Sequence, residues 1–315
     1  MIRRPAFLAL PAILAVAGAS TLLAQRDANA SPPVTVAAGD NVQAAASAAV
    51  VEAGGPVQAP VAPAAQPGTR SRVIKDVLPS SVRINLAVSG KVIRAASGVI
   101  LGFGKSTDGQ RVGYVMTNTH VVETDQPDQT RIDVLVDRKG RTSTFRAKVL
   151  AVGEVPDMDL ALLEVPDLEG RAVQLASDGE IDLGDDVLAV GAPFGRGISI
   201  SSGIVSQLEW DDAGAARAFK TDAPIGYGAS GGGIFRVPDG KLLAVIEGYR
   251  TAKVSFPMAE RNYSFDVPMP GETFAAPAAK VRSFLMEKGV AHLVAAQFPG
   301  EAPEKLQPAT QTAAR

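Results

Sequence analysis

Short apolar runs separated by turn-forming residues dominate the middle of the chain. Runs rich in Val, Ile, Leu and Ala that are bounded by Gly, Asp and Pro are typical of β-strands. A first series lies at residues 82–88, 96–101, 112–117, 132–136, 147–152 and 160–165. A second series lies at residues 186–191, 201–207, 218–221, 233–235, 242–247 and 263–267. Two successive sets of strands predict an all-β fold built from two barrels or sandwiches.

One long helix is predicted after the strands, at residues 277–288. It begins with Pro277, it places Val281, Phe284 and Leu285 on one face, and Gly289 follows its last residue. Proline at the start and glycine just past the end are typical helix boundaries.

The ends of the chain lack this patterning. Residues 31–70 are mainly Ala, Pro, Val, Gly and Gln without an aromatic residue, which predicts a flexible linker. Residues 298–315 combine prolines with small polar residues and predict a disordered tail. The folded domain is therefore expected at 71–297, with a first unit at about 73–170 and a second at about 180–270.

The first 30 residues are typical of an export signal. Two arginines precede an uncharged stretch at residues 6–24, and an Ala-Asn-Ala sequence ends at Ala30, after which we expect cleavage. The alternative is an uncleaved anchor in the inner membrane, because that stretch is about long enough to span a bilayer. Either outcome places the folded domain outside the cytoplasm, in the periplasm or the medium.

Composition narrows the classes of function. The chain of 315 residues is 46% hydrophobic and has a net charge of −2, from 31 basic and 33 acidic residues. This balance gives no reason to expect nucleic acid or an anionic membrane surface as the main partner. The absence of cysteine excludes disulfides, a cysteine nucleophile and thiolate metal sites, and with only two distant histidines we expect no metal and no cofactor.

Three segments carry candidate chemistry: TNTHVV at 117–122, MDLALL at 158–163 and GYGASGGG at 226–233. They offer a base, His120, an orienting acid, Asp159, and a nucleophile, Ser230. A serine hydroxyl needs a base to take its proton, and the base needs a carboxylate to hold its tautomer. The order His, Asp, Ser is that of the two-barrel serine peptidases and differs from the orders of subtilisins and of hydrolases with Ser first.

Each of these residues also has an ordinary structural interpretation. Ser230 fits a glycine-rich turn, His120 fits a partly buried strand end, and Asp159 fits a turn cap. Asp157 competes for the role of the acid, but Asp159 directly enters the apolar run and is better placed for burial beside a histidine. Glycines around Ser230 allow a close backbone approach, so the N–H groups of Gly228 and Ser230 are the predicted oxyanion donors.

Further segments support one resemblance: residues 77–82, 96–100, 184–195, 202–206, 220–225 and 264–268. With the three segments above, the chain resembles the trypsin-like serine peptidases over about residues 73–289, and in particular the protease domain of the bacterial HtrA/Deg family. This resemblance implies two six-stranded antiparallel barrels, with His120 and Asp159 on the first and Ser230 on the second. It also implies an extended polypeptide substrate beside the edge of the second barrel.

The chain departs from the pattern of this family in informative ways. Relatives carry Asp or Asn immediately before the serine, whereas this chain has Ala229, so a side chain that would brace the oxyanion loop is missing. No PDZ domain is expected after the helix, and an oligomer such as a trimer remains open.

Pro224 and Ile225 resemble the wall of the specificity pocket and indicate a preference for small or medium apolar side chains in the substrate. Glu247 at the rim would instead favour basic residues, unless it is an exposed strand charge.

These observations predict an exported serine endopeptidase that cleaves unfolded or extended proteins. A different class stays open, a catalytically silent peptide-binding module on the same fold, in which Ala229 reflects a relaxed site. An esterase is a third option, which the order of the three residues disfavours.

Overall fold

The structure is a computed structural model that describes residues 68–106, 108–212, 214–258 and 261–307. The predicted export signal at 1–30, the predicted linker except for its last three residues, and residues 308–315 lie outside the described residues. Helix α1 (Thr69–Val77) already occupies the last two positions assigned to that linker. Within the described ranges, no helix is both long enough and apolar enough to cross a membrane.

The first half of the domain is a closed antiparallel barrel. Its strands are β1 (Ser81–Val88), β2 (Lys91–Lys105), β3 (Arg111–Thr117), β4 (Thr130–Arg138), β5 (Arg141–Val152) and β6 (Ala161–Pro166). They pair in the order β1-β2-β3-β6-β5-β4, and the pairing of β1 with β4 closes the ring. Residues that alternate along the strands, such as Ile84 and Leu86 on β1, fill the interior.

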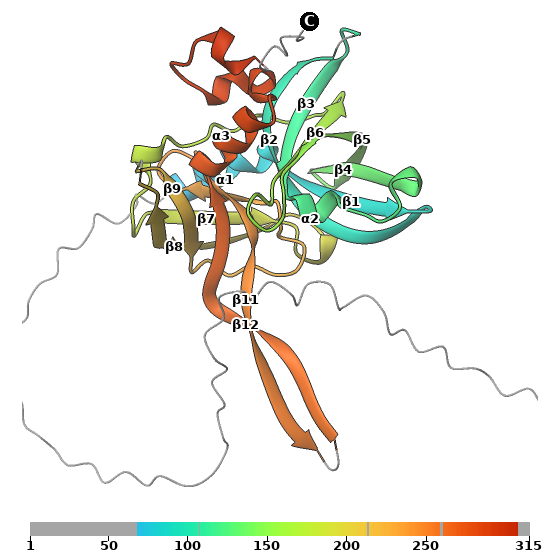
Figure 1. Ribbon diagram of the computed structural model, residues 1–315, viewed down its shortest axis with the longest axis vertical. Coiled ribbons are helices and arrows are strands. Elements are labelled where there is room, and N and C mark those ends of the chain that lie inside the picture. The colour runs from blue at the N-terminus through green and yellow to red at the C-terminus, as the bar shows by residue number, and fades with distance from the viewer. Residues whose placement is uncertain (1–67, 107, 213, 259–260, 308–315) are drawn as a thin grey trace, which may run out of the picture. The chain divides into compact units, whose positions relative to one another are not determined.

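The second half repeats this architecture. Its strands are β7 (Asp186–Gly191), β8 (Ser199–Trp210), β9 (Ala216–Thr221), β10 (Gly233–Arg236), β11 (Leu242–Met258) and β12 (Arg261–Pro277). They pair in the order β10-β11-β12-β9-β8-β7, and β7 closes on β10. The predicted helix follows as α3 (Ala278–Glu287) and buries Val281, Phe284 and Leu285. The expected all-β fold of two six-stranded barrels with a C-terminal helix is confirmed (Figure 1).

Short helical turns connect these elements. They are α2 (Thr119–Val122) and the 3₁₀ turns η1 (Leu78–Ser80), η2 (Pro127–Gln129), η3 (Asp178–Glu180), η4 (Pro193–Gly195), η5 (Ala291–Gln297) and η6 (Pro303–Leu306). Two of them, α2 and η4, lie at the junction of the barrels and form part of the candidate site.

An apolar interface joins the two barrels. On β2, Ile100 belongs to the interior of the first barrel, whereas its neighbours Val99 and Leu101 belong to a second cluster. That cluster also contains Val190 and Val245 of the second barrel. Successive strand residues point to opposite faces, so one strand fills a barrel interior and also contacts the other barrel.

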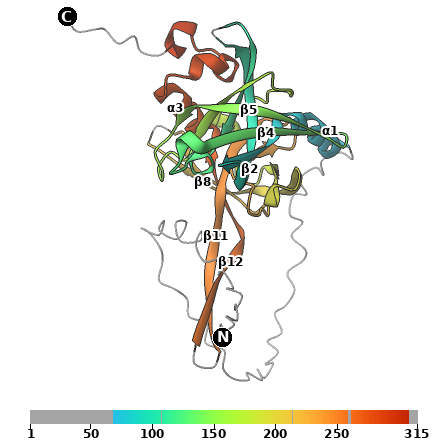
Figure 2. The ribbon, with the colours of Figure 1, turned by 90° about the vertical axis from the view of Figure 1, so that its right-hand side faces the viewer.

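The hairpin of β11 and β12 is longer than the sequence predicts. The predicted strands were 242–247 and 263–267, whereas the structure pairs residues 251–258 with 261–268 in a continuous ladder. Figures 1 and 2 show this part of the hairpin projecting away from the barrels. Phe256 stacks on Tyr263 and meets Phe265 edge-on, and these contacts join the two strands beyond the barrel.

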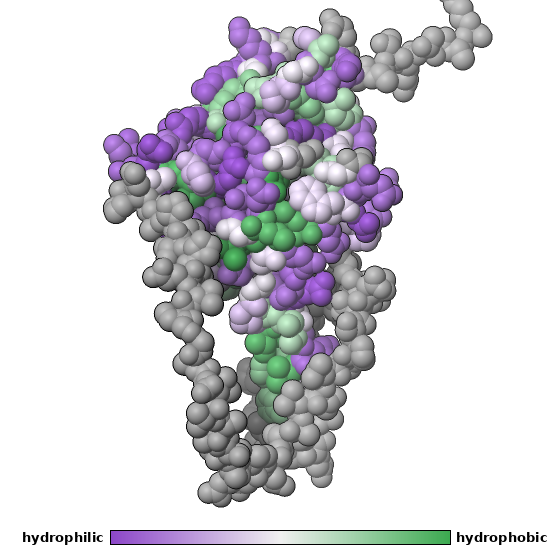
Figure 3. Space-filling model, turned by 90° about the vertical axis from the view of Figure 1, so that its left-hand side faces the viewer, coloured by the Kyte–Doolittle hydropathy of each residue, from purple (hydrophilic) through white to green (hydrophobic). Residues whose placement is uncertain are grey.

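The projecting hairpin has one apolar face. Val254 lies opposite Phe265 and Phe256 lies opposite Tyr263, so these four side chains share one side of the ribbon. All four are between 38% and 51% exposed, and Figure 3 shows apolar atoms along this projecting part. The alternating pattern of a half-buried strand therefore continues where the described domain provides no cover for it.

The predicted disordered tail begins too early. The chain is described through Gln307, and both Phe298 and Leu306 are buried in the main apolar cluster. The Gln297 side chain fixes this segment, because its amide donates to the carbonyls of Leu101 and Val173, each at 2.7 Å. The prolines that indicated disorder include Pro303, which starts the turn η6 that carries Leu306.

Removal of the projecting hairpin tests whether the barrels depend on it. The variant deletes residues 252–267 and joins Thr251 to Pro268, which are paired in the ladder, through an Asn-Gly turn. The barrel pairings of β11 and β12 lie outside the deleted segment, so we expect the thermal midpoint to change by less than about 3 °C. Circular dichroism against the full chain measures this, and a larger fall would mean that the hairpin supports the barrel.

Candidate active site

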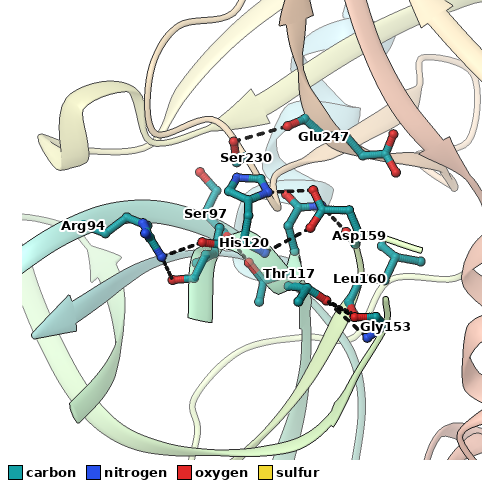
Figure 4. Close-up of polar contacts among 12 residues, drawn as sticks. Arg94, Ser97, Thr117, His120, Gly153, Asp159, Leu160, Ser230 and Glu247 are labelled. Carbon is teal, nitrogen blue, oxygen red and sulfur yellow. Dashed lines mark hydrogen bonds and ion pairs between the residues drawn. The ribbon is translucent and has the colours of Figure 1, made fainter. Parts of the chain in front are cut away.

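His120 lies on the short helix α2, which several side chains fix in place. Arg94 of β2 donates from Nη1 to the carbonyls of His120, of Val121 at 3.2 Å and of Glu123 at 3.0 Å, and so satisfies carbonyls at the end of this turn (Figure 4). Burial lowers the pKa of the Arg94 guanidinium, which stays charged in proteins. The backbone that carries His120 is thereby fixed.

Thr119 anchors the other side of the same turn. Its hydroxyl donates to the carbonyl of Leu160 at 2.8 Å and accepts from the N–H of Gly153 at 3.2 Å. Leu160 directly follows Asp159, so this contact ties the segment of the predicted base to that of the predicted acid.

His120 and Asp159 form a tight pair. Nδ1 of His120 lies 2.6 Å from Oδ2 of Asp159, and the backbone N–H of His120 donates to Oδ1 at 3.0 Å. The carboxylate is buried, whereas 27% of the imidazole side chain is exposed. Both carboxylate oxygens thus contact one residue, which fixes the orientation of the ring and holds the proton on Nδ1. Asp157, the competing acid, is exposed.

Ser230 lies in the loop between β9 and β10, on the second barrel. Its hydroxyl donates to the carbonyl of Glu247 at 3.4 Å. Figure 4 shows the imidazole of His120 with Ser230 on one side and Asp159 on the other. Within the described chain no hydrogen bond joins the Ser230 hydroxyl to the ring, and such bonds often shorten only when substrate is bound. The three predicted residues therefore meet across the junction of the barrels.

Hydrogen bonds hold every carbonyl of the loop from Tyr227 to Ser230. The Phe194 N–H donates to the Tyr227 carbonyl at 2.6 Å, and the Ser97 hydroxyl donates to the Gly228 carbonyl at 2.7 Å. The Gly232 N–H donates to the Ala229 carbonyl and the Ser97 N–H donates to the Ser230 carbonyl, each at 2.9 Å. Because each peptide unit is planar, these bonds fix four successive peptide planes. Two of the four donors come from one residue of the first barrel.

The N–H groups of this loop divide into two kinds. Those of Ala229, Gly231 and Gly232 donate to backbone carbonyls. Those of Gly228 and Ser230, the predicted oxyanion donors, have no protein acceptor among the described residues, and neither does that of Tyr227. Gly228 has a φ of +92°, and a Cβ there would lie 2.7 Å from the Ala192 carbonyl oxygen, so the position requires glycine.

The residues predicted for the specificity pocket do not all line one cavity. Pro224 and Ile225 line a cavity of about 30 Å³ together with Ala189, Ile246, Ser199 and Ser201. Glu247 does not line this cavity. Its carboxylate pairs with Lys280 of α3 at 3.1 Å, and only 14% of its side chain is exposed. Neither interpretation of Glu247 from the sequence, a charged rim or an exposed strand charge, describes this partly buried ion pair.

Sequence reasoning missed several residues that build the site. Arg94 and Ser97 act from β2 on segments far along the chain, and Ser97 lies in a strand whose pattern indicated only core packing. Tyr227 stands beside the loop with Phe194 and Tyr249, at ring distances of 6.4 and 5.7 Å. Burial and the hydrogen bond with Tyr227 raise the pKa of the Tyr249 hydroxyl.

Comparison with known proteins shows which family this part of the chain is similar to. Residues 96–245 match the family described as "Trypsin-like peptidase domain". Over this part the chain is similar to trypsin-like peptidase domains. The chain is 34% identical over 159 residues to the "Periplasmic serine endoprotease DegP" of Salmonella typhimurium, a match that covers 49% of this chain and 30% of that protein. It is 30% identical over 224 residues to "Serine protease HTRA1B" of Danio rerio, covering 68% of this chain and 40% of that protein.

A solved structure shares the fold of the peptidase domain. The crystal structure of the serine endoprotease from Yersinia pestis matches with a TM-score of 0.50 and 25% identity, over 73% of this chain and 68% of that chain. The two relatives named above are longer proteins, of which this chain spans 30% and 40%. The resemblance to HtrA/Deg proteases is confirmed for the peptidase domain.

Substitution of Gly231 tests how closely the Ser230 loop approaches the first barrel. A Cβ at Gly231 would lie 2.2 Å from the Ser97 carbonyl oxygen and 2.3 Å from Thr117 Oγ1, and φ there is +81°. We expect Gly231→Ala to cost about 2 kcal/mol or more, a fall in thermal midpoint of roughly 4–8 °C. Gly197→Ala is the control, because a Cβ there meets nothing within 4 Å. Equal midpoints for the two variants would contradict the close approach.

Proposed function

We propose that this chain is a serine endopeptidase that hydrolyses peptide bonds in unfolded or extended proteins. The observation that carries the proposal is the buried Asp159 carboxylate, whose two oxygens orient His120 at the junction where Ser230 lies. The peptidase family and relatives named as serine endoproteases support the same reaction.

Each residue has a distinct task in the proposed reaction. Ser230 Oγ attacks the carbonyl carbon of the substrate while His120 Nε2 takes the hydroxyl proton. Asp159 accepts the Nδ1–H and stabilises the imidazolium that forms. His120 then gives the proton to the leaving amine, and a water activated by the same ring hydrolyses the acyl-enzyme.

The amides of Gly228 and Ser230 bind the developing oxyanion. The support is that both N–H groups lack an acceptor in the described chain while the surrounding carbonyls are all held. Donors fixed before the reaction stabilise the charge without reorganisation, and loss of one costs on the order of 3 kcal/mol in comparable sites.

We also propose that the protein acts in the periplasm. The predicted signal at residues 1–30 and the printed names of relatives such as "Periplasmic serine endoprotease DegP" support this location. A polypeptide passing through the junction of the barrels in an extended form would present one carbonyl to Ser230.

Labelling with a fluorophosphonate probe and digestion of casein test the proposed activity. Wild type should be labelled and should cleave, and Ser230→Ala should lose both, because loss of a triad nucleophile lowers turnover by about a millionfold. Asp159→Asn should lower kcat by roughly 10⁴-fold, because the amide favours the wrong tautomer of His120. Asp157→Asn is the matched control and should leave kcat unchanged. A folded wild type that resists labelling yet binds peptide would favour the catalytically silent module.

Substrate preference follows from the pocket. Pro224 and Ile225 give the cavity an apolar wall, and Lys280 neutralises Glu247. In peptides that differ only at the residue before the cleaved bond, Ala or Val should be processed at least about tenfold faster than Arg. Glu247→Gln should not change this ratio. A preference for Arg that disappears in Glu247→Gln would contradict the assignment.

A further inference from the structure

The Ser230 loop needs a brace that its own sequence does not provide. Ala229 is 2% exposed, and its methyl group neither donates nor accepts a hydrogen bond. It packs beside Gly191, where an added Cβ would lie 3.1 Å from the Ala229 Cα. The second barrel therefore holds the Ala229 side chain by packing alone, while the backbone N–H and carbonyl of Ala229 bond to Gly226 and Gly232.

A side chain of the other barrel makes the missing polar contacts. The Ser97 hydroxyl donates to the Gly228 carbonyl at 2.7 Å and accepts from the Ala192 N–H at 2.8 Å. Ser97 is 1% exposed, so these bonds form away from solvent, where an unpaired polar group is costly. One hydroxyl thereby links the loop to the segment that follows β7.

The backbone of Ser97 adds a third contact. Its N–H donates to the Ser230 carbonyl at 2.9 Å, and its carbonyl accepts from the Thr117 hydroxyl at 2.8 Å. Ser97 thus holds the carbonyls of both residues whose N–H groups would bind the oxyanion, and Thr117 holds Ser97. Gly228 has the conformational freedom of glycine, so the direction of its N–H depends on such partners.

We propose that Ser97 is a positioning residue for the oxyanion amides and supplies from the first barrel the brace that Ala229 cannot. This inference rests on the proposed peptidase function. The Ser97 hydroxyl itself does not touch the substrate. It fixes the peptide plane between Gly228 and Ala229, and with the Phe194 contact to the Tyr227 carbonyl it fixes both planes that flank Gly228.

Ser97→Ala tests this role. The oxyanion forms only in the transition state, so we expect kcat to fall roughly ten- to hundredfold with little change in KM. The rate constant of fluorophosphonate labelling should fall by a similar factor. Because a rate constant does not depend on how much of the sample is folded, loss of folded protein alone would leave it unchanged.

Ser80→Ala is the matched control. Ser80 is also 1% exposed, and its hydroxyl also makes a buried bond, to the Val77 carbonyl at 2.6 Å, but it does not contact the loop. Its labelling rate constant should equal that of wild type. Ser97→Cys keeps the shape of the side chain and offers only a weak donor, so it provides the same test if Ser97→Ala does not fold.

The outcomes separate the two proposals. If folded wild type is not labelled, the peptidase function fails. If wild type is labelled and the folded Ser97 variants react within twofold of Ser80→Ala, the peptidase function stands and the positioning role is wrong. A fall confined to the Ser97 variants, in kcat but not in KM, supports the positioning role.

Discussion

The apolar contact between two closed barrels is the constraint on which the site depends. Each barrel completes its own hydrogen-bond ladder, so the ladders themselves do not fix how the two barrels lie against each other. Val99 and Leu101 of the first barrel and Val190 and Val245 of the second share one buried cluster, which sets their relative position. Because His120 and Ser230 lie on opposite sides of this contact, a shift between the barrels would separate the proposed base from the proposed nucleophile.

The same hydrogen bonds stabilise the Asp159–His120 pair and serve the chemistry proposed for it. A buried carboxylate is costly unless it is fully hydrogen-bonded. His120 supplies two of the contacts that Asp159 needs, through its backbone N–H and its ring. The pair is therefore held where a charged imidazole can be stabilised, while the exposed part of the ring faces the junction. Arg94 and Thr119 then fix the turn from which the histidine extends.

The sequence predicted the elements that depend on local patterns of residues. It did not predict the contacts between residues that are far apart in the chain. The sequence predicted the barrel strands because alternating and apolar runs end at Gly, Asp and Pro. It selected the segments of His120, Asp159 and Ser230 as one candidate site because residue type and order restrict the options, and their catalytic roles stay a prediction. The hairpin extension was missed because Gly248 and Pro257 interrupt the pattern. Residues 298–307 were missed because their prolines outweighed two apolar residues that pack on the core. Ser97 and the Glu247–Lys280 pair depend on contacts across 131 and 33 positions of sequence, which no local pattern encodes.

Ala229 makes the Ser230 loop depend on the interface between the barrels. If a polar side chain at position 229 braced the loop from within the second barrel, the order of the loop would depend on that barrel alone. With alanine there, polar contacts to the Gly228 and Ser230 carbonyls come from Ser97, on the far side of the interface. Order in the oxyanion loop then depends on the same barrel contact that brings His120 to Ser230. The departure at Ala229 therefore does not by itself imply a relaxed site, because the constraint has moved from one barrel to the interface between the two.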